Sequence, residues 1–286
     1  GSLKTCISCA EDKAKQKYVP KKTYTPKCTI PGERMNLDIS TVTVSKQDNT
    51  LFRIKNKYWV ILADEATGKK LAEFVATKKS MPERICELIS KLKAKGITVK
   101  VVRMDNAGEN KALHKKMHSN EWKMFWCEVE YTAPNTPQQN SPAETSFTTL
   151  TGRAKALLIN AKVPLADRFK LFPYAAQTAT KLDGLSVVTI NGITATRHKH
   201  QLGFEPGWTK YLHTWGEAGT VCLKARKHSK VVDKGQTMMF VGYPDDHPAD
   251  TFNMWDPATK RTHKSRDVIF LKRLFFESSD IQAGKG

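Results

Sequence analysis

The chain lacks any apolar run long enough to cross a membrane. Its 286 residues contain no stretch approaching the ~18 consecutive apolar residues that a membrane-spanning helix needs. The N-terminal residues also lack the apolar core of a signal peptide. No internal repeat is detected, which argues against a solenoid or propeller architecture. We therefore expect a globular protein with no membrane partner.

Cysteine is scarce and irregularly placed. The six cysteines are Cys6, Cys9, Cys28, Cys86, Cys127 and Cys222. Only Cys6 and Cys9 have a spacing typical of metal ligands, and the other four are scattered, which favours a reducing compartment over a disulfide framework. Cys86 falls in a helical pattern, and Cys127 and Cys222 fall in strand patterns, so we expect these three to be core thiols.

Acidic residues are outnumbered. The chain has 28 Asp and Glu against 47 Lys and Arg, which gives a net charge of +19 and a pI of about 9.6. Such an excess indicates a polyanionic partner, most often nucleic acid, although a basic protein that is merely soluble stays an alternative. The apolar content of 40% suits a globular core and excludes a disordered chain.

Three acidic residues in separate local contexts are the strongest functional signal. Asp38 and Asp105 each close an apolar, strand-like run, and Glu144 opens a long segment with few helix breakers. Taken singly, each has a simpler interpretation as a solvated strand-end acid or a helix N-terminal acid. At the end of the buried strand ending at Met104, however, an unpaired Asp105 carboxylate would be costly, so we expect a metal or cation beside it. Together the three carboxylates suggest a site for paired Mg²⁺ ions.

The periodicity predicts alternating strands and helices around these acids. The expected elements are strands at Met35–Ile39, Tyr58–Ala63, Leu71–Thr77, Thr98–Met104 and Phe125–Thr132, and helices at 82–96, Asn110–His118, 144–161 and Arg168–Leu182. This order is similar to the ribonuclease H-like arrangement. Residues 183–214 are basic and are expected to be irregular. Short strands then follow at Thr220–Ala225, Thr237–Tyr243, Phe252–Asp256 and Val268–Leu271, which indicates a small β-barrel.

Several motifs resemble the integrase segment of copia-type (Pseudoviridae) LTR retrotransposon polyproteins. Met104–Glu109 and Thr136–Glu144 are similar to the second and third catalytic blocks of the retroviral integrase core, and Ala63–Thr67 resembles a second-strand signature whose acid is structural or peripheral. Farther on, the motifs Trp215-Gly216, Phe240-Val241-Gly242-Tyr243 and Ser265-Arg266-Asp267-Val268-Ile269-Phe270 resemble the copia-type C-terminal domain. The resemblance covers about residues 4–275.

The resemblance implies an α/β fold in two parts. A ribonuclease H-like catalytic core with a mixed five-stranded sheet is expected at 30–180, and a barrel of the Src-homology-3 type that binds DNA is expected at 215–275. The remaining segments are expected to be a basic lead-in at 1–29 with a remnant of an N-terminal zinc module, a linker at 181–214 and a tail at 276–286.

The resemblance also implies a chemistry. Asp38, Asp105 and Glu144 would be both the catalytic residues and the ligands of two Mg²⁺ or Mn²⁺ ions, for 3′-end processing and strand transfer of element DNA into target DNA. The partners would be double-stranded DNA, from the element ends and the target, and further copies of the chain on that DNA. The place of action would be the nucleus, with a cytoplasmic virus-like particle beforehand.

DNA contacts are expected from side chains around the acids and from a basic run in the barrel. The candidates are Asn106, Gln139, Asn140, Arg153, Lys224, Arg226 and Lys227. Read more simply, the run from Lys224 is an exposed loop. The cluster Arg197-His198-Lys199-His200 could suggest a metal site, but a solvated basic loop is favoured.

Two departures from the family pattern bear on activity. Relatives usually follow the catalytic glutamate with arginine and other basic residues, whereas here Thr145–Thr149 are uncharged and Arg153 is the first basic residue. Cys6 and Cys9 resemble the closing half of a His-His-Cys-Cys zinc module, but the first histidine is His114. A bound Zn²⁺ is therefore expected only where a complete module lies upstream, and two ordinary thiols are favoured.

Two alternatives to an active integrase stay open. A domesticated or decayed copy would bind DNA without catalysis, which the uncharged stretch after Glu144 favours and the intact acids oppose. Another ribonuclease H-like nuclease or a transposase would share the acids but not the motifs around Phe240 and Asp267.

Overall fold

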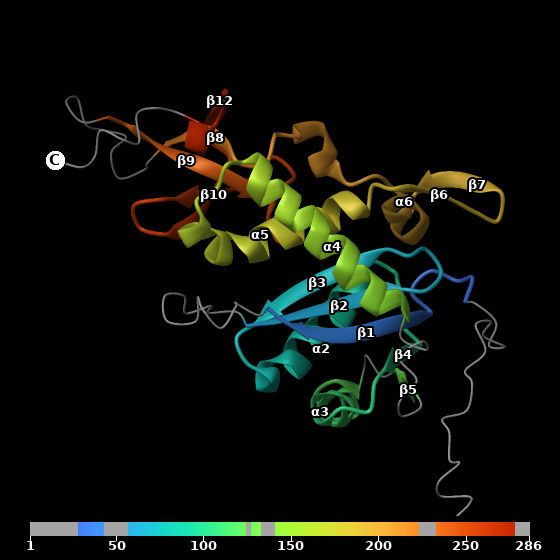
Figure 1. Ribbon diagram of the computed structural model, residues 1–286. Helices are drawn as coiled ribbons and strands as arrows, with labels where there is room; N and C mark the ends of the chain where they lie inside the picture. Colours follow the sequence, from blue (N-terminus) through green and yellow to red (C-terminus); the bar gives the residue numbers. More distant parts are fainter. Residues whose placement is uncertain (1–27, 43–56, 124–126, 133–140, 223–232, 278–286) are drawn as a thin grey trace, which may run out of the picture.

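The computed structural model describes residues 28–42, 57–123, 127–132, 141–222 and 233–277, and for residues 141–144 the helical backbone alone. Two five-stranded sheets make up most of the molecule, with the long helices α4 and α5 between them (Figure 1). Within the described residues, no helix is both long and apolar enough to span a membrane.

The first sheet has the mixed topology that the sequence predicts. Its strands are β1 (Arg34–Thr41), β2 (Tyr58–Asp64), β3 (Lys70–Val75), β4 (Val101–Met104) and β5 (Glu128–Tyr131). They lie in the order β3-β2-β1-β4-β5, with β1 antiparallel to β2 and parallel to β4. Strands β1, β2 and β3 form an antiparallel meander, and β4 and β5 extend it in parallel. The order of strands and helices confirms the ribonuclease H-like core.

Helices cover both faces of this sheet, which is why β2 is apolar from Trp59 to Ala63. On one face, Val60 and Leu62 pack with residues of α2 (Met81–Ala94) and α3 (Gly108–Met117). On the other face, Trp59 and Ile61 pack with residues of α4 (Ser141–Asn160) and α5 (Leu165–Asp183). The sequence pattern predicts one inward face of α4 with Leu150, Ala154, Leu157 and Leu158; the first two and Leu158 are buried there, and Leu157 is only partly buried.

The second sheet is antiparallel and lies over the opposite side of α4 and α5 (Figure 1). Its strands are β8 (Glu217–Cys222), β9 (Gly235–Gly242), β10 (Phe252–Asp256), β11 (Arg261–Ser265) and β12 (Val268–Leu274), in the order β11-β10-β9-β8-β12. Four of these strands were predicted. The exposed and charged strand β11 was missed because it lacks the apolar alternation of its neighbours.

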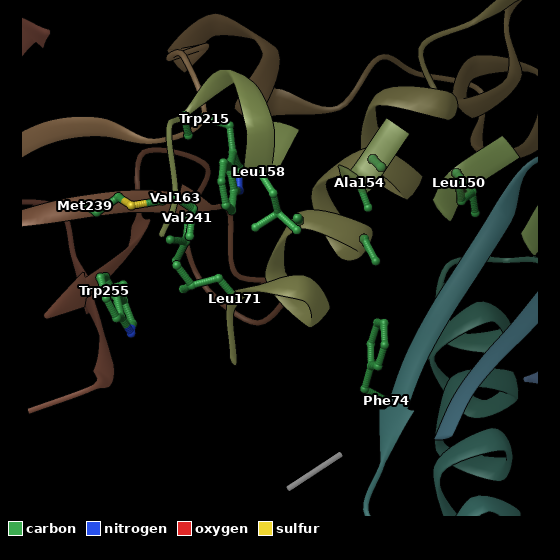
Figure 2. Close-up of a cluster of buried hydrophobic side chains, with 14 of the residues drawn as sticks. Phe74, Leu150, Ala154, Leu158, Val163, Leu171, Trp215, Met239, Val241 and Trp255 are labelled. Carbon is green, nitrogen blue, oxygen red and sulfur yellow. The ribbon is translucent and has the colours of Figure 1, made fainter. Parts of the chain in front are cut away.

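One apolar cluster joins the two sheets through α4 and α5. The cluster includes Leu158 of α4 and Leu171 of α5. It also includes Trp215, which precedes β8, and three residues of the second sheet, Met239, Val241 and Trp255. Figure 2 shows Trp215 beside Leu158, with Val241 and Val163 next to each other and Leu171 below them. The cluster continues across α4 to Phe74 of β3. The two parts of the chain therefore share a core.

Residues 183–214 are ordered, so the expectation of an irregular linker there is wrong. They form β6 (Val187–Ile190), β7 (Ile193–Thr196), the short helix α6 (Arg197–Leu202) and the 3₁₀ helix η4 (Gly207–Tyr211). The turn between β6 and β7 is Asn191-Gly192, with φ of 50° and 78°, as a two-residue hairpin turn requires. The prediction failed because the Gly, Pro and basic residues of this segment are typical of a loop, whereas tertiary contacts order it.

A buried carboxylate ties this segment to the core. Asp183, at the end of α5, accepts hydrogen bonds from Lys70 of β3, Arg153 of α4 and Arg197 of α6, each at 2.6 Å. Its side chain is 2% exposed. Burial alone would raise the pKa of Asp183, but the hydrogen bond from Lys70 and the three positive charges outweigh it, and the pKa is lowered. For Lys70, burial outweighs the pairing and lowers the pKa of the ammonium.

Gly216 tests the contact between the two parts. Its φ is +92°, and an added Cβ would lie 2.3 Å from Ala161 Cβ at the end of α4. We expect Gly216→Ala to lower the free energy of unfolding by about 3 kcal/mol, since left-handed strain and overpacking add. The measurement is urea unfolding followed by tryptophan fluorescence. Gly96→Ala is the control, because Gly96 has a φ of +81° and open space around it. Equal losses for the two variants would contradict a tight contact.

Asp183→Asn tests the buried ion cluster. Removing the charge leaves Lys70, Arg153 and Arg197 facing one another, so we expect a loss of about 3 kcal/mol in the free energy of unfolding at neutral pH. Because the folded pKa of Asp183 is lowered, its contribution is full above the unfolded value of about 3.9 and is lost as pH falls through the folded pKa.

The control for Asp183→Asn is Glu87→Gln, which breaks the exposed pair with Arg84 and should cost less than about 1 kcal/mol. Denaturant unfolding at several pH values compares the variants. If the free energy of unfolding of Asp183→Asn falls with acid as much as that of the unmodified chain, another carboxylate causes the acid dependence.

Candidate functional site

Two of the three predicted acids lie on adjacent parallel strands. Strand β1 pairs with β4 in a register that sets Arg34 opposite Val101 and Asn36 opposite Arg103. The same register, continued past the last paired residues, brings Asp38 level with Asp105. Asp38 lies within β1 and is partly exposed, and Asp105 follows the last residue of β4 and is exposed. Asp38 and Asp105 therefore lie on two adjacent strands, each two residues past the last pair of the β1–β4 register.

Asp105 is stabilised by solvent and by its own turn. Its Oδ1 accepts hydrogen bonds from the amide of Ala107, at 3.1 Å, and from Asn110 Nδ2. The sequence-based argument that Asp105 must be compensated because it is buried is wrong. The strand is buried through Met104, but the chain leaves the sheet at the next residue, so the carboxylate reaches water.

Asn110 is a neighbour of Asp105 that the sequence analysis did not single out. It is 2% exposed, and its Nδ2 donates to both the carboxylate and the backbone oxygen of Asp105, the latter at 3.2 Å. Asn110 lies on the buried stripe of α3 with Leu113 and Met117. The sequence signal for this role was that Asn110 is a polar residue on the apolar stripe of α3. The contact fixes the orientation of the Asp105 side chain.

A cation also lies beside this turn. Lys78, in the 3₁₀ helix η1 (Lys78–Ser80) that follows β3, forms an ion pair with Glu109 in the first turn of α3. The hydrogen bond from Lys78 lowers the pKa of Glu109, and the bond to Glu109 raises the pKa of Lys78. Lys78 Nζ also lies 5.8 Å from the centroid of the Tyr58 ring. No sequence pattern links Lys78 to Glu109, because only the fold brings η1 next to the start of α3.

The third acid, Glu144, lies in the first turn of α4, and its side chain is outside the described residues. Helix α4 packs across β1, the strand that contains Asp38, and across its neighbour β2. Asn106, a predicted DNA contact, is exposed directly after Asp105. The structure thus brings Asp38, Asp105 and Asn106 to one region, and the position of the Glu144 carboxylate stays a prediction.

The remaining predicted site residues divide into two groups. Gln139, Asn140, Lys224, Arg226, Lys227, Cys6 and Cys9 lie outside the described residues. Arg153 is described, and its guanidinium forms the ion pair with Asp183 while its side chain stays 46% exposed. A DNA contact by Arg153 stays a prediction, but its position is set by the fold.

Asp64, in the block that resembles a second-strand signature, has a structural role. It is 1% exposed and accepts hydrogen bonds from the amides of Gly32 and Ala66, from Thr67 Oγ1 and from Gln201 Nε2. These bonds join the turn before β1, the turn after β2, and α6. The expectation that this acid is structural fits its contacts.

The basic cluster from Arg197 to His200 is not a solvated loop, so that interpretation is wrong. It forms helix α6, where Arg197 bonds to Asp183 and His200 Nε2 contacts the oxygen of Val188 at 3.0 Å. Burial and the charges of Lys69 and Lys95 lower the pKa of His198 to about 4. The run of basic residues has the composition of a loop, but it forms α6, and one side of α6 packs on Asp183.

The thiols follow the expectation in part. Cys86 and Cys127 are buried, and burial raises their pKa values to about 12 and about 11. Cys222 is exposed, so its assignment as a core thiol is wrong. It ends β8 next to the buried Val221, and alternation along the strand turns it outward.

The donor chemistry around Asp38 and Asp105 fits a hard divalent cation, since Mg²⁺ is bound through carboxylate oxygens. Among the described side chains, no cluster of three or more His, Cys, Asp or Glu gathers to hold a metal. Only two of the three predicted ligands, Asp38 and Asp105, have described side chains. The side chain of the third, Glu144, lies outside the described residues.

Comparison with known proteins supports the C-terminal assignment. Residues 219–283 match the family described as "Retroviral polymerase SH3-like domain". This match covers the second sheet and confirms the expected barrel of the Src-homology-3 type.

A curated relative covers most of the chain. The "Retrovirus-related Pol polyprotein from transposon TNT 1-94" of Nicotiana tabacum is 26% identical over 226 residues, which is 75% of this chain. The chain spans 15% of the length of that polyprotein, so it corresponds to one region of a much longer protein.

Two solved structures are similar in outline. A chain of the simian T-cell lymphotropic virus intasome is 12% identical, with a TM-score of 0.44, and covers 91% of this chain and 84% of that one. The HTLV-2 integrase catalytic core domain in complex with magnesium is 14% identical, with a TM-score of 0.38, and covers 60% of this chain and 97% of that one.

The polyprotein relative aligns with most of the chain, and the family match covers its C-terminal part. The first sheet has the strand order of a ribonuclease H-like core. The chain is thus similar in sequence to a region of a retrotransposon Pol polyprotein, and it combines a ribonuclease H-like core with an SH3-like C-terminal domain.

Proposed function

We propose that this chain catalyses divalent-metal-dependent 3′-end processing and strand transfer of element DNA into target DNA. The observation that carries the proposal is the parallel pairing of β1 and β4, whose register brings Asp38 level with Asp105. Two carboxylates on neighbouring strands, with a helix that begins near a third acid, suit phosphoryl transfer.

Asp38, Asp105 and Glu144 would hold two Mg²⁺ or Mn²⁺ ions. Such ions, when bound, activate an attacking hydroxyl and stabilise the leaving oxygen of a phosphodiester. The chain's own residues orient the ligands. Asn110 and the Ala107 amide hold one oxygen of Asp105, and the β1–β4 pairing holds Asp38 beside it. With water as the attacking group the product is a processed 3′ end, and with a DNA 3′-hydroxyl it is a joined strand.

The partner in this proposal is double-stranded DNA, from the element ends and from the target. The net charge of +19 supports it, because a basic protein gains affinity for a polyanion when counterions are released. The reaction would take place in the nucleus, with several copies of the chain assembled on the DNA.

A second candidate is an integrase-derived protein that binds DNA without cutting it. The observation that favours it lies on α4 after Glu144. Thr145, Thr148 and Thr149 are exposed and uncharged, and the next cation, Arg153, is paired with Asp183. This stretch of α4 thus offers no cation before Arg153 to hold DNA phosphates close to the acids.

Asp105→Asn tests the catalytic proposal. It removes one charge at nearly constant shape, and Asn can still accept the bond from the Ala107 amide. We expect strand transfer to fall about 10²–10³-fold or more, because each metal interaction supplies several kcal/mol of transition-state stabilisation. The measurement is an Mn²⁺- or Mg²⁺-dependent reaction with the element's own terminal DNA. Asp246→Asn, at a side chain that is 65% exposed, is the control.

The outcomes separate the two candidates. Full strand-transfer activity in Asp105→Asn would contradict the assignment of Asp105 as a catalytic residue. An unmodified chain that binds terminal DNA but joins no strands in either metal would favour the non-catalytic candidate.

The basic run in the C-terminal domain predicts how the chain binds DNA. Lysine and arginine contacts to phosphates carry little sequence information, so binding to duplex DNA should be largely independent of sequence. The logarithm of the binding constant should fall linearly with the logarithm of salt concentration, by about 0.9 per phosphate neutralised. The variant with Lys224, Arg226 and Lys227 changed to Glu should bind more weakly on every sequence, with a slope flattened by up to about three phosphates.

Fluorescence anisotropy across a salt series measures this slope. Changing Lys91, Lys93 and Lys95 of the α2 region to Glu is the control, with the same change of charge at a different site. A slope in the first variant equal to that of the unmodified chain would show that the run at Lys224 is only a solvated loop.

A further inference from the structure

Lys78 lies at the end of the first sheet where β1 and β4 lead to the two acids. Strands β3, β1 and β4 run in the same direction, so their last residues lie at one end of the sheet. In the strand order β3-β2-β1-β4-β5, Lys78 follows β3 and Glu109 follows β4, so the ion pair between them crosses the ends of β2 and β1. Asp38 lies within β1, and Asp105 directly follows the last residue of β4. The pair therefore sets a lysine ammonium at the same end of the sheet as both acids.

The fold holds the side chain of Lys78 in place. Lys78 begins η1, which runs directly into α2, and α2 packs on the sheet through a buried apolar stripe. Thr77 caps η1, because its Oγ1 accepts a hydrogen bond from the amide of Ser80 at 3.3 Å. The ammonium lies 5.8 Å from the centroid of the Tyr58 ring, within the range of a cation–π contact. A lysine whose position is set before a ligand arrives loses less conformational entropy when it binds one.

Lys78 is charged and open to a ligand. The hydrogen bond to Glu109 raises the pKa of Lys78, and the negative charge of Asp105 acts in the same direction. The side chain of Lys78 is 47% exposed. An ammonium carries three donor hydrogens, and one of them serves Glu109. The others can donate to acceptors that approach from solvent.

The charges at this end of the sheet indicate which ligand Lys78 serves. Asp38, Asp105 and Glu109 are acids, so a phosphodiester that approaches them meets repulsion unless cations offset it. Helix α4, which brings the third predicted acid, has no Lys or Arg ahead of Arg153, and Arg153 is paired with a buried carboxylate. Lys78 supplies the positive charge that this part of α4 does not.

We propose that Lys78 is a substrate-contacting residue, which donates to a phosphate of the DNA strand beside the bond that is cut or joined. This contact deepens the proposed function and rests on it, because the DNA and the catalytic acids come from there. Lysine contacts to phosphates fix the register of a strand and carry little sequence information, so Lys78 orients the strand without selecting its sequence. A strand held at one phosphate next to the reacting bond is kept close to the geometry of attack.

A double-mutant cycle between protein and DNA tests the contact directly. Duplexes of the element's terminal sequence each carry one uncharged methylphosphonate in place of a phosphate, at successive positions around the reacting bond. Fluorescence anisotropy measures the dissociation constant of the full chain on each duplex in Ca²⁺, which carboxylate oxygens bind as they bind Mg²⁺. The variants are Lys78→Gln and its matched control Lys79→Gln. Lys79 is the next residue of η1, is exposed and, within the described part of the chain, forms no ion pair.

We expect Lys78→Gln to weaken binding to the all-phosphate duplex about five- to tenfold, since it removes a hydrogen bond between two charged groups. The salt slope should fall by about one phosphate. At one position next to the reacting bond, the methylphosphonate should weaken binding of the unmodified chain by a similar factor and have no further effect in Lys78→Gln, because the two changes remove the same contact. In Lys79→Gln, the loss from the methylphosphonate should be as large as in the unmodified chain.

Mn²⁺ binding without DNA separates a DNA contact from damage to the acid site. Isothermal titration calorimetry should give Lys78→Gln an Mn²⁺ affinity equal to or above that of the unmodified chain, because the variant removes a positive charge near the acids. Thermal unfolding should be nearly unchanged, since a partly exposed ion pair contributes little to stability. If Lys78→Gln loses affinity for Mn²⁺ as much as for DNA, its effect lies in the metal site and the contact is refuted.

The remaining outcomes distinguish this contact from the proposed function. Losses that add at every methylphosphonate position, or a Lys79→Gln variant as weak as Lys78→Gln, would overturn the contact, while Asp105→Asn could still abolish strand transfer. A single position of non-additive loss, in a chain that joins no strands in Mn²⁺ or Mg²⁺, would support the contact and contradict the catalytic proposal.

Discussion

Trp215 lies against the C-terminal end of α4, and the apolar cluster around it decides how the rest of the molecule is arranged. The cluster takes residues from the first sheet, from α4 and α5, and from the SH3-like domain. Removing any of the three layers would expose large apolar side chains of the other two to water. Gly216 allows the close approach, because its neighbour Ala161 leaves no room for a Cβ. The ribonuclease H-like core and the SH3-like domain are therefore two sequence units with one buried interior.

Two buried carboxylates complete this arrangement where apolar packing cannot. Asp64 receives four hydrogen bonds from turns and from α6, and Asp183 receives three cations from β3, α4 and α6. A buried charge persists only when it is paired and hydrogen-bonded, so each carboxylate fixes the segments that serve it. Both act on α6, which explains why residues between the core and the C-terminal domain are ordered.

The edge where the β1–β4 pairing brings Asp38 and Asp105 together is of a different kind. Asp105 is exposed, and its contacts are to its own turn and to Asn110. An exposed carboxylate of this kind needs no buried ion pair, in contrast to Asp183, whose side chain is 2% exposed. The β6–β7 hairpin is again different, since residues 184–196 include no charged side chain and Val187 and Ile193 are exposed.

The sequence by itself determined most of the strands and helices of the two sheets and their cover. Alternation and helical periodicity predicted the strand that ends at Met104 and the stripe of Leu150, Ala154 and Leu158, because burial imposes those periods locally. The motif order around Asp105 and Asp267 indicated the family and both parts of the fold. The thiol of Cys222 and the exposure of Asp105 were misjudged, since each depends on where a strand leaves the sheet, and a pattern fixes such ends poorly.

Only the tertiary structure decided which distant residues meet. Asp183 lies 113 positions from Lys70 and 14 from Arg197, and no periodicity relates them. Lys78 reaches Glu109, and Asn110 turns toward Asp105, because the chain crosses from β3 through α2 to β4 and α3. The composition of residues 183–214 indicated a loop, yet their hydrogen bonds to buried carboxylates order them. Local physics sets the elements, whereas the pairing of charges across them depends on how the sheets and helices pack.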